Sequence, residues 1–431
     1  MGVAHPDTRG YRGPVPSSMS RREFLLRSAA IAGAIPAAEV LLTACSGNEA
    51  PSDASTEARK LARPDDPVEW PILGETIPSD LPIEKGGVLR LYTWEMYVKP
   101  SLLRRFEDET GVRVEVTEFA DQFDAVARLR TGGSDFDVVI GITVDVLGSL
   151  VGAGLAQPLN HDYLSGLSGL WGNFQNPYYD LGSRYTVPYF VWTSGLAWRN
   201  DVIPDAAVRY SYNPYGIFWE ERFAGRSHLL NGSRESTAMA LLKNGIFDVN
   251  TEDPGKLDVA LQDLLDLAEL THPRFDHRDY RDLFGRVVLH QSWSGNIGFM
   301  RFYAPEPSDM RNISFWWPPQ GGTGFPGVVG SDTMLILSGT EVPVAAHALI
   351  DFLMDPSIAV ENATYEGYQP PLSAIEPEIL IEREVLPRHL KNVLVSEQDF
   401  AEGLPLLELS PAGAQAWDQI YSQVLFASKT L

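Results

Sequence analysis

Aromatic rings and carboxylates close to predicted loops are the side chains of this 431-residue chain whose types and spacing could do chemistry. A cleft lined by ring faces and a few carboxylates suits an extended organic cation. Its methylenes lie against the rings, and its ammonium groups gain cation–π contacts and charge-assisted hydrogen bonds. Taken singly, each ring could instead be packed in the core. The rings near loops are Trp94, Tyr97, Trp192, Trp219, Trp293 and Tyr368.

The common signatures of catalysis do not occur in the sequence. It contains no GxSxG elbow, HExxH pair, P-loop or dinucleotide fingerprint. A single cysteine excludes an intramolecular disulfide, a thiolate zinc cage and a CxxC redox pair. His272 and His277 flank a stretch that contains Pro273 and lacks helical ligand spacing, so a surface loop is expected there. The chain is therefore predicted to be no enzyme and to hold neither a metal ion nor a cofactor.

Length and composition point to a folded, acidic protein of two or three domains. Hydrophobic residues at 44% and charged residues at 21% are ordinary globular values, which exclude disorder as the main state. The 34 basic and 57 acidic residues give a formal charge of −23. Such a chain repels phosphate backbones, so nucleic acid is not expected as a partner. A cationic or neutral partner is favoured, although a merely soluble acidic surface explains the charge as well.

The first residues have the order of an export signal. Arg21 and Arg22 precede a mildly apolar stretch that is too short to span a bilayer. The stretch ends in Leu-Thr-Ala-Cys, which resembles the bacterial lipobox and predicts acylation of Cys45. The alternative is a free buried cysteine in an N-terminal helix. We expect residues 1–44 to be a twin-arginine lipoprotein signal peptide and residues 45–85 to be a lipidated cysteine with a flexible tether. The protein would then be anchored outside the cytoplasmic membrane, in the periplasmic space or at the cell surface.

The segment after the predicted tether alternates strand and helix patterns. Two of the strands are short and continuously apolar, which indicates a parallel sheet in an α/β domain. Ligands bind at the carboxyl ends of such strands. The loops at residues 94–97 and 141–145 should therefore lie on one edge of the sheet. The predicted strands are 88–94, 112–116 and 136–140, and the predicted helices are 100–111, 122–130 and one from 143 or 145 to about 152–154.

Beyond residue 188 the pattern resets and predicts a second α/β lobe. Residues 196–198 look like a connecting strand, and residues 229–230 and 287–289 look like further strands. A helix is expected at about 237–243. Another begins at Asp253-Pro254 and has its leucines on one face.

Several of these stretches carry a resemblance. From about residue 87 to residue 371 the chain resembles bacterial periplasmic spermidine/putrescine-binding proteins of polyamine ABC transporters. The resemblance implies a two-lobed periplasmic-binding-protein fold with a hinge and an interlobe ligand cleft. It also implies lobe 1 at 86–194 plus 331–372 and lobe 2 at 195–330 plus 373–431. The matching stretches are Leu-Tyr-Thr-Trp-Glu-Met-Tyr-Val-Lys-Pro at 91–100, Phe-Asp-Val-Val at 136–139, Val-Pro-Tyr at 187–189, Asn-Thr-Glu-Asp-Pro at 250–254, Trp-Ser-Gly at 293–295 and Gly-Tyr-Gln-Pro at 367–370.

The resemblance also implies site residues. Asp332 matches a cleft aspartate that receives an amino group, Glu235 matches a carboxylate of the second lobe, and Glu95 could supply a further ion pair. The chain departs from the pattern at Ile142, Val144 and Gly330, and Glu95-Met96 replaces a hydroxyl-acid pair. The aromatic positions that match the lining of the family's cleft are Trp94, Tyr97, Trp293 and Tyr368.

These observations predict a lipid-anchored substrate-binding protein of an ABC importer. It would capture a small cation resembling spermidine or putrescine and deliver it to the membrane subunits of the permease. One alternative keeps the fold and changes the solute to another amine, an amino-acid derivative or an anion. The other alternative is an exported enzyme, which would need a nucleophile-base pair or a metal constellation.

Overall fold

The computed structural model describes residues 59–132, 135–209, 211–318 and 326–430. The predicted signal peptide, the predicted lipidation site at Cys45 and the first part of the predicted tether lie outside the described residues. The strands are β1 (Val88–Trp94), β2 (Arg113–Phe119), β3 (Val138–Thr143), β4 (Thr186–Arg199), β5 (Ser227–Leu229), β6 (Arg274–Phe275), β7 (Leu289–Trp293), β8 (Ile313–Trp316), β9 (Val328–Ile336) and β10 (Leu404–Pro405).

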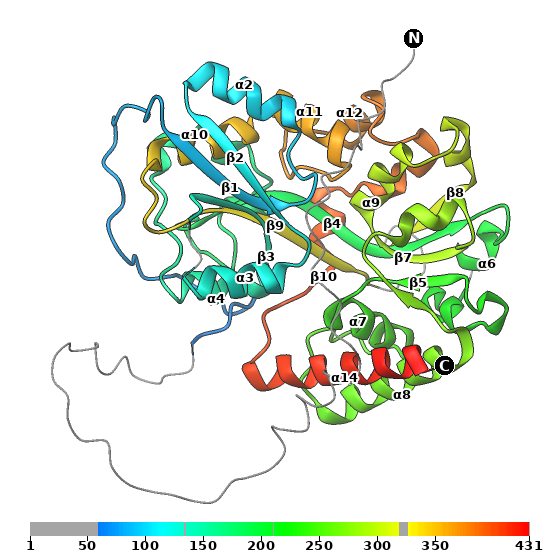
Figure 1. The fold of residues 1–431 in the computed structure, drawn as a ribbon. Helices are drawn as coiled ribbons and strands as arrows, with labels where there is room; N and C mark the ends of the chain where they lie inside the picture. The colour runs from blue at the N-terminus through cyan, green and yellow to red at the C-terminus, as the bar shows by residue number, and fades with distance from the viewer. Residues whose placement is uncertain (1–58, 133–134, 210, 319–325, 431) are drawn as a thin grey trace, which may run out of the picture. The chain divides into compact units, whose positions relative to one another are not determined.

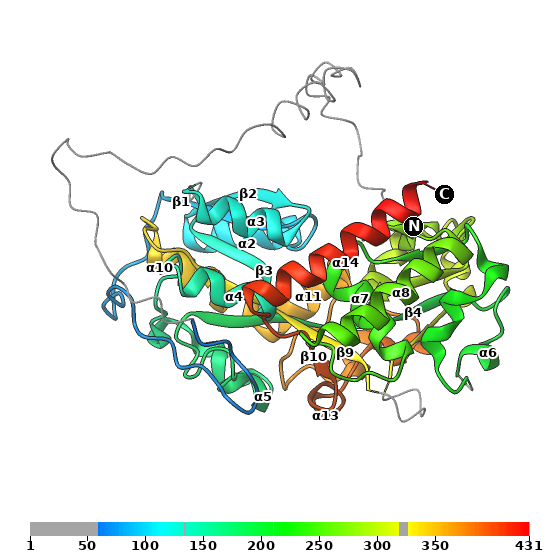
Figure 2. The same ribbon diagram turned by 90° about the horizontal axis from the view of Figure 1, so that it is seen from below.

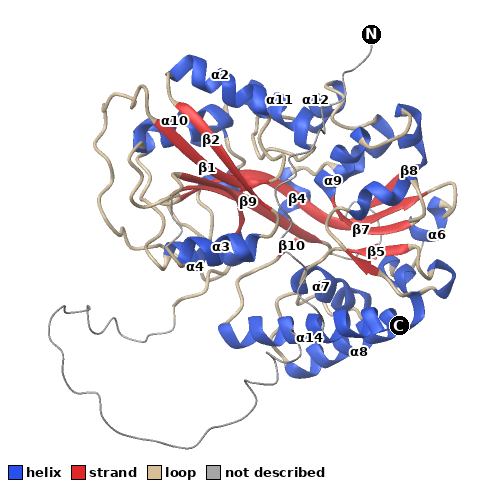
Figure 3. Ribbon diagram, in the orientation of Figure 1, coloured by secondary structure: helices blue, strands red, loops and turns tan. Residues whose placement is uncertain are grey.

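These strands form one mixed sheet with helices on both faces (Figures 1 and 3). Their order is β2-β1-β3-β9-β4-β7-β5-β6, with β10 beside β9 and β8 beside β4. The α-helices are α2 (Pro100–Thr110), α3 (Gln122–Arg130), α4 (Val144–Val151), α5 (Gly172–Gln175), α6 (Asp205–Arg209), α7 (Ser233–Lys243), α8 (Pro254–Thr271), α9 (Ser294–Phe299), α10 (Pro343–Met354), α11 (Pro356–Glu366), α12 (Pro377–Glu382), α13 (Glu397–Ala401) and α14 (Pro411–Thr430). Short 3-10 helices cover His161–Tyr163, Ser165–Gly169, Pro214–Trp219, Glu221–Phe223, Asp279–Phe284, Met300–Phe302, Pro307–Asn312 and Arg388–Val393.

The first lobe is built on three parallel strands, as the sequence predicts. β1 lies between β2 and β3 and is parallel to both. Proline in the first turn of α2 and Gly111 with φ of 73° after its last turn set the ends of that helix. The Asp121 side chain accepts the N–H groups of Phe123 and Asp124 and so caps α3. β2 and β3 each extend three residues beyond their predicted ends.

Two long central strands connect the halves of the sheet. β4 and β9 are antiparallel and paired from Thr186–Leu335 to Ser194–Val328. β9 also pairs with β3 of the first lobe, and the end of β4 pairs with β7 and β8 of the second. The predicted connecting strand at 196–198 is the last part of β4. The two lobes therefore share continuous backbone at the centre of the molecule (Figure 1).

The second lobe contains β5, β6 and β7, which run parallel to one another. The helix predicted at 237–243 is present and begins earlier, at Ser233. α8 begins at Pro254 as predicted, with Asp253 as its N-cap. α14 lies alongside α7 and α8, as both views show (Figures 1 and 2). The lobe boundaries in the sequence stay a prediction.

Alternation along the strands divides the core between the two faces of the sheet. In the first lobe, Leu89 and Leu91 of β1 pack with Phe106 of α2 on one face. Tyr92 of β1 packs with Leu129 of α3 on the other face. A second-lobe cluster is built around buried residues that include Trp198, Leu241, Leu264 and Trp417.

Within residues 59–85, the structure differs from the predicted flexible tether. Trp70 is 6% exposed, and its indole N–H donates to the Tyr179 carbonyl at 2.8 Å. The Val68 N–H donates to the Tyr178 carbonyl at 2.8 Å, and Arg59 forms an ion pair with Glu408. The prediction of a solvated tether up to residue 85 is wrong here. A polar composition does not reveal that one tryptophan and a few backbone groups find partners far along the chain.

Taken singly, none of the helices in the described part of the chain has both the length and the apolar composition to cross a membrane. The pair α10 and α11, bent by 78° at the break between them, meets the criterion by length and composition only.

Candidate functional site

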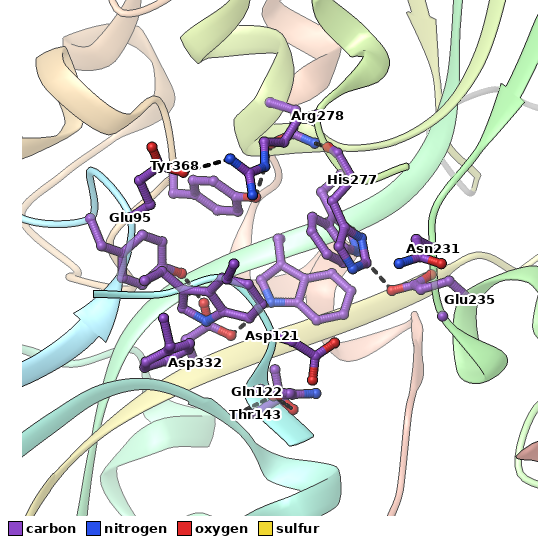
Figure 4. Close-up of a pocket in the computed structure, with 18 of the residues that line it drawn as sticks. Glu95, Asp121, Gln122, Thr143, Asn231, Glu235, His277, Arg278, Asp332 and Tyr368 are labelled. Carbon is purple, nitrogen blue, oxygen red and sulfur yellow. Dashed lines mark hydrogen bonds and ion pairs between the residues drawn. The ribbon is translucent and has the colours of Figure 1, made fainter. Parts of the chain in front are cut away.

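A cavity of about 190 Å³ lies where the two lobes face each other. The first lobe contributes the loop after β1, the segment from the end of β2 to the start of α3, and the junction of β3 with α4. The second contributes the start of α7, the residues before and within the 3-10 helix at 279–284, and the start of α9. In the wall of this cavity, where Figure 4 labels Glu95, Glu235, Asp332 and Tyr368, the structure brings together all seven residues that the sequence assigns to ligand binding. They are Trp94, Glu95, Tyr97, Glu235, Trp293, Asp332 and Tyr368.

Asp332, on β9, is a buried carboxyl group with neutral hydrogen-bond partners. The residue is 4% exposed, and its carboxylate accepts the Tyr97 hydroxyl and the Trp192 indole N–H, the latter at 3.1 Å. Burial raises the pKa of Asp332 to about 8, because the charged form loses its hydration. A cation seated beside it would reverse that shift.

Glu235 provides a second buried carboxylate, in the first turn of α7. It accepts the Ser194 hydroxyl at 2.6 Å and the Trp293 indole N–H at 2.7 Å. Burial raises its pKa above the ordinary value, and these two hydrogen bonds oppose the shift. Asp332 and Glu235 stand at opposite sides of the pocket (Figure 4). Each end of the cavity thus offers a buried carboxyl group.

Aromatic rings line the cavity between these ends, and glycines leave the space that the rings occupy. Trp94 donates its indole N–H to the Gly141 carbonyl at 2.7 Å. A Cβ at Gly141 would lie 2.3 Å from the Trp94 ring, and its φ of 99° also favours glycine. A Cβ at Gly295 would lie 2.2 Å from the Tyr368 ring. The positions of these two rings therefore depend on residues without side chains.

Trp192 explains one departure from the polyamine-binding pattern. It lies directly opposite Gly330 in the β4–β9 pair, and a Cβ at Gly330 would lie 2.1 Å from Cζ2 of the ring. The Trp192 ring thus occupies the space over Gly330 and lines the cavity. Ile142 and Val144, two further departures, pack in a hydrophobic core cluster. Trp219 does not reach the cavity either, because it packs in the second-lobe core and donates to the Asp263 carbonyl.

Glu95 lies at the cavity wall with its charge already paired. Its carboxylate contacts the Arg278 guanidinium at 2.9 Å, and both side chains are about half exposed, at 47% and 52%. Arg278 comes from the second lobe, so this ion pair joins the two lobes. The sequence predicts that Glu95 pairs with the ligand. In the structure, a ligand would have to compete with Arg278 for this carboxylate.

Several residues of the wall were not predicted from the sequence. His277, expected in a surface loop, is partly buried and stacks on the Trp293 ring, with ring centroids 5.0 Å apart. Asp145 follows the third strand on the expected edge of the sheet, and burial raises its pKa. Its place in the loop 141–145 was the signal that could have found it. Further residues of the wall that were not predicted are Asp121, Arg234, Tyr280, Arg281, Asn296 and Glu366.

Metal binding finds no support among the described residues. Within them, no group of three or more His, Cys, Asp or Glu side chains could hold a metal ion. The cavity instead combines carboxyl groups with ring faces. This arrangement suits a small cation that is bound without covalent chemistry.

Comparisons with known proteins point to one kind of protein. A family model described as bacterial extracellular solute-binding protein matches residues 91–359. A putrescine/agmatine-binding protein of Pseudomonas aeruginosa is 29% identical over 350 residues, which cover 78% of this chain and 91% of that protein. Spermidine/putrescine-binding periplasmic protein 1 of Haemophilus influenzae is 28% identical, over 68% of this chain and 78% of that one.

A solved structure gives the same fold. The spermidine/putrescine ABC transporter substrate-binding protein PotD of Streptococcus pneumoniae aligns with a TM-score of 0.65 at 20% identity. The alignment covers 80% of this chain and 100% of that chain. The predicted two-lobed periplasmic-binding-protein fold is confirmed.

Proposed function

The chain belongs to the bacterial extracellular solute-binding protein family, and from this premise we propose that it binds a polyamine-like cation for an ABC importer. The observation that carries the proposal is an interlobe cavity with a buried carboxyl group at each end, Asp332 and Glu235, and aromatic rings between them. Relatives named for putrescine, agmatine and spermidine support the same class of solute.

The binding steps follow from the groups in the wall. An ammonium group beside Asp332 restores the charge that burial suppresses, because a cation within about 4–6 Å lowers the pKa of a carboxyl group. A second ammonium group meets Glu235 in the same way. The methylenes between them lie against the rings of Trp94, Trp293 and Tyr368. No bond is made or broken, and the solute leaves unchanged when the lobes separate.

Delivery requires a membrane transporter and a place outside the cytoplasm. The family acts outside the cell, which agrees with the predicted extracytoplasmic location. We assign the partner as the permease subunits of an ABC importer. The twin-arginine pair at Arg21 and Arg22 would direct export, and an acyl group on Cys45 would hold the protein at the outer face of the cytoplasmic membrane. The order of arginine pair, apolar stretch and lipobox in the sequence supports both assignments.

Calorimetric titration of the full chain in detergent tests the binding function. The panel contains putrescine, spermidine, an acidic amino acid and a sugar. We expect saturable binding of the diamines and none of the sugar. Exclusive binding of the acidic amino acid or the sugar would overturn the polyamine assignment and would favour the same fold with another solute.

Metabolic labelling with a radioactive fatty acid tests the anchor. The wild-type chain should incorporate label and sediment with membranes, and Cys45→Ser should do neither. Equal labelling of both chains would contradict acylation at Cys45.

A further inference from the structure

Glu366 is a buried carboxyl group in the cavity wall, and only one of its two oxygens accepts a hydrogen bond. It is the last residue of α11 and is 3% exposed. Gly367 follows with φ of 83°, and this turn brings the Tyr368 N–H back to one oxygen, Oε2. The other oxygen, Oε1, is buried and has no hydrogen-bond partner.

Arg301, whose charge acts on Glu366, does not satisfy that oxygen. The guanidinium of Arg301 donates to the carbonyls of Gly298, Val385 and Thr364. Burial raises the pKa of Glu366 well above its usual value, and the charge of Asp332 adds to the shift. The charge of Asp332 thus acts on Glu366, and both residues line the same cavity.

An unsatisfied carboxyl oxygen inside a protein is destabilising unless something else supplies its partner. Ionised, the two carboxylates offer about eight lone-pair positions, since each has about four. Three of these are taken by the Tyr97 hydroxyl and the N–H groups of Trp192 and Tyr368. About five remain.

This count distinguishes between cationic end groups. An ammonium group has three N–H donors at one point, whereas a guanidinium has five in a planar fork. The planar group also stacks on ring faces, and Tyr97 and Tyr368 meet edge to face beside this end of the cavity, with centroids 5.8 Å apart. The donors of a guanidinium match the remaining acceptors, and those of an ammonium leave some unfilled.

We propose that Glu366 and Asp332 together form a guanidinium subsite, so that this protein prefers amines ending in a guanidino group over simple alkyl diamines. Glu366 is then a specificity-determining residue of the cavity. The proposal rests on the proposed function, because it requires a cationic solute in this cavity.

The test compares putrescine with agmatine, which has the same four-carbon spacer and one guanidino end. Calorimetry on the full chain measures both dissociation constants for wild type, Glu366→Gln and Glu366→Asp. Wild type should bind agmatine more tightly. Loss of a hydrogen bond to a charged group should weaken agmatine binding by about tenfold or more in Glu366→Gln, and putrescine binding by much less. Glu366→Asp, whose carboxylate is withdrawn by one methylene, should also lower the preference.

Glu361→Gln is the matched control on the same helix. Glu361 is 41% exposed at its side chain and pairs with Lys99 outside the cavity. It should keep the wild-type preference. Thermal melting shows whether each variant folds, and Glu366→Asp decides the outcome if Glu366→Gln does not.

Two results distinguish a failure of the guanidinium subsite from a failure of the proposed function. If wild type binds diamines and the folded Glu366 variants keep the wild-type ratio of the two constants, the guanidinium subsite is wrong while the polyamine function stands. If wild type binds neither amine, the proposed function fails and this inference fails with it.

Discussion

The surroundings of Asp332 disfavour the charged form of its side chain. Its partners, Tyr97 and Trp192, are neutral, and burial alone raises its pKa to about 8. In the unliganded protein the carboxyl group therefore favours its neutral form. Burial of this carboxyl group lowers the stability of the folded, unliganded protein at neutral pH. A bound cationic solute compensates for that loss.

Asp332→Asn should make the unliganded protein more stable at neutral pH and should abolish tight diamine binding. The folded pKa lies above the unfolded value of 3.8, so the folded state loses stability as the pH rises from about 4 to about 8. At pH 7 the neutral amide avoids a cost of up to about 4 kcal/mol, since each pKa unit corresponds to about 1.4 kcal/mol. Chemical denaturation at pH 5 and pH 7 measures the effect, which should be larger at pH 7.

The same variant tests the assignment of Asp332 through binding. Removing one partner of a buried charge pair costs about 2–5 kcal/mol, so diamine affinity should fall by about thirtyfold or more. Glu361→Gln, outside the cavity, should bind like wild type. Unchanged stability together with unchanged affinity in Asp332→Asn would remove this residue from the site.

Binding should depend on pH in the sense that follows from this pKa. As the pH rises from about 6 to about 8.5, Asp332 ionises and the affinity for a diamine should increase. Below pH 8 the cation displaces a proton from the carboxyl group, so binding should release protons. Titrations in phosphate and in Tris should then give different apparent enthalpies. Identical enthalpies in the two buffers at pH 7 would mean that no proton leaves.

At the scale of elements, the β4–β9 pair positions Asp332 and Trp192 together. Trp192 lies opposite Gly330, and Asp332 follows two residues later on the same strand and face. The absence of a side chain at Gly330 lets the indole ring lie across β9 and donate to Asp332. A strand with a glycine at this register therefore helps to build the binding site.

Gly330→Ala should weaken diamine binding by about tenfold without changing any charge, because the new Cβ forces the Trp192 ring away from Asp332 and a hydrogen bond to a charged group is lost. Calorimetry measures the affinity. Gly216→Ala is the control, because a Cβ at Gly216 has no other atom within 4 Å. Equal affinities of the two variants would show that the ring position does not matter.

Local sequence patterns predicted the elements of the first lobe well. Pro100, Gly111 and Asp121 mark helix ends through interactions within a few residues of themselves. The edge of the sheet that carries the site also follows from parallel strands. Residue types and family resemblance then placed Trp94, Asp332 and the other five residues around one cavity.

Contacts between distant segments could not be predicted in this way. The packing of Trp70 on Tyr179 and the match of Trp192 to Gly330 depend on strand order and on pairs of residues more than one hundred positions apart. Glu366 gave no signal, because a glutamate at the end of a helix is usually solvated. The turn at Gly367 brings the Tyr368 N–H to its carboxylate instead.

At the scale of the whole molecule, the Glu95–Arg278 pair joins the first lobe to the second beside the cavity. Both side chains are about half exposed, so the pair contributes at most about 1 kcal/mol. Its position suits a contact that favours the closed arrangement of the lobes over an open one.

Arg278→Gln should therefore speed release of a bound diamine by about two- to fivefold at low salt, the range expected for an exposed pair. Dissociation of radiolabelled putrescine, chased with an excess of unlabelled putrescine, measures the rate. Glu95→Gln should have a similar effect, and the double variant should add little, because either change breaks the same pair. Fully additive effects would show that the two residues act separately.

The placement of the indole rings has a practical consequence. Trp94, Trp192 and Trp293 line the cavity, whereas Trp198, Trp316 and Trp417 are fully buried in the second-lobe core. A solute that enters the cavity replaces water and changes the field around the first group and leaves the second group untouched. Intrinsic fluorescence should therefore report occupancy directly, and the unchanged emission of the core tryptophans supplies a constant background within the same molecule.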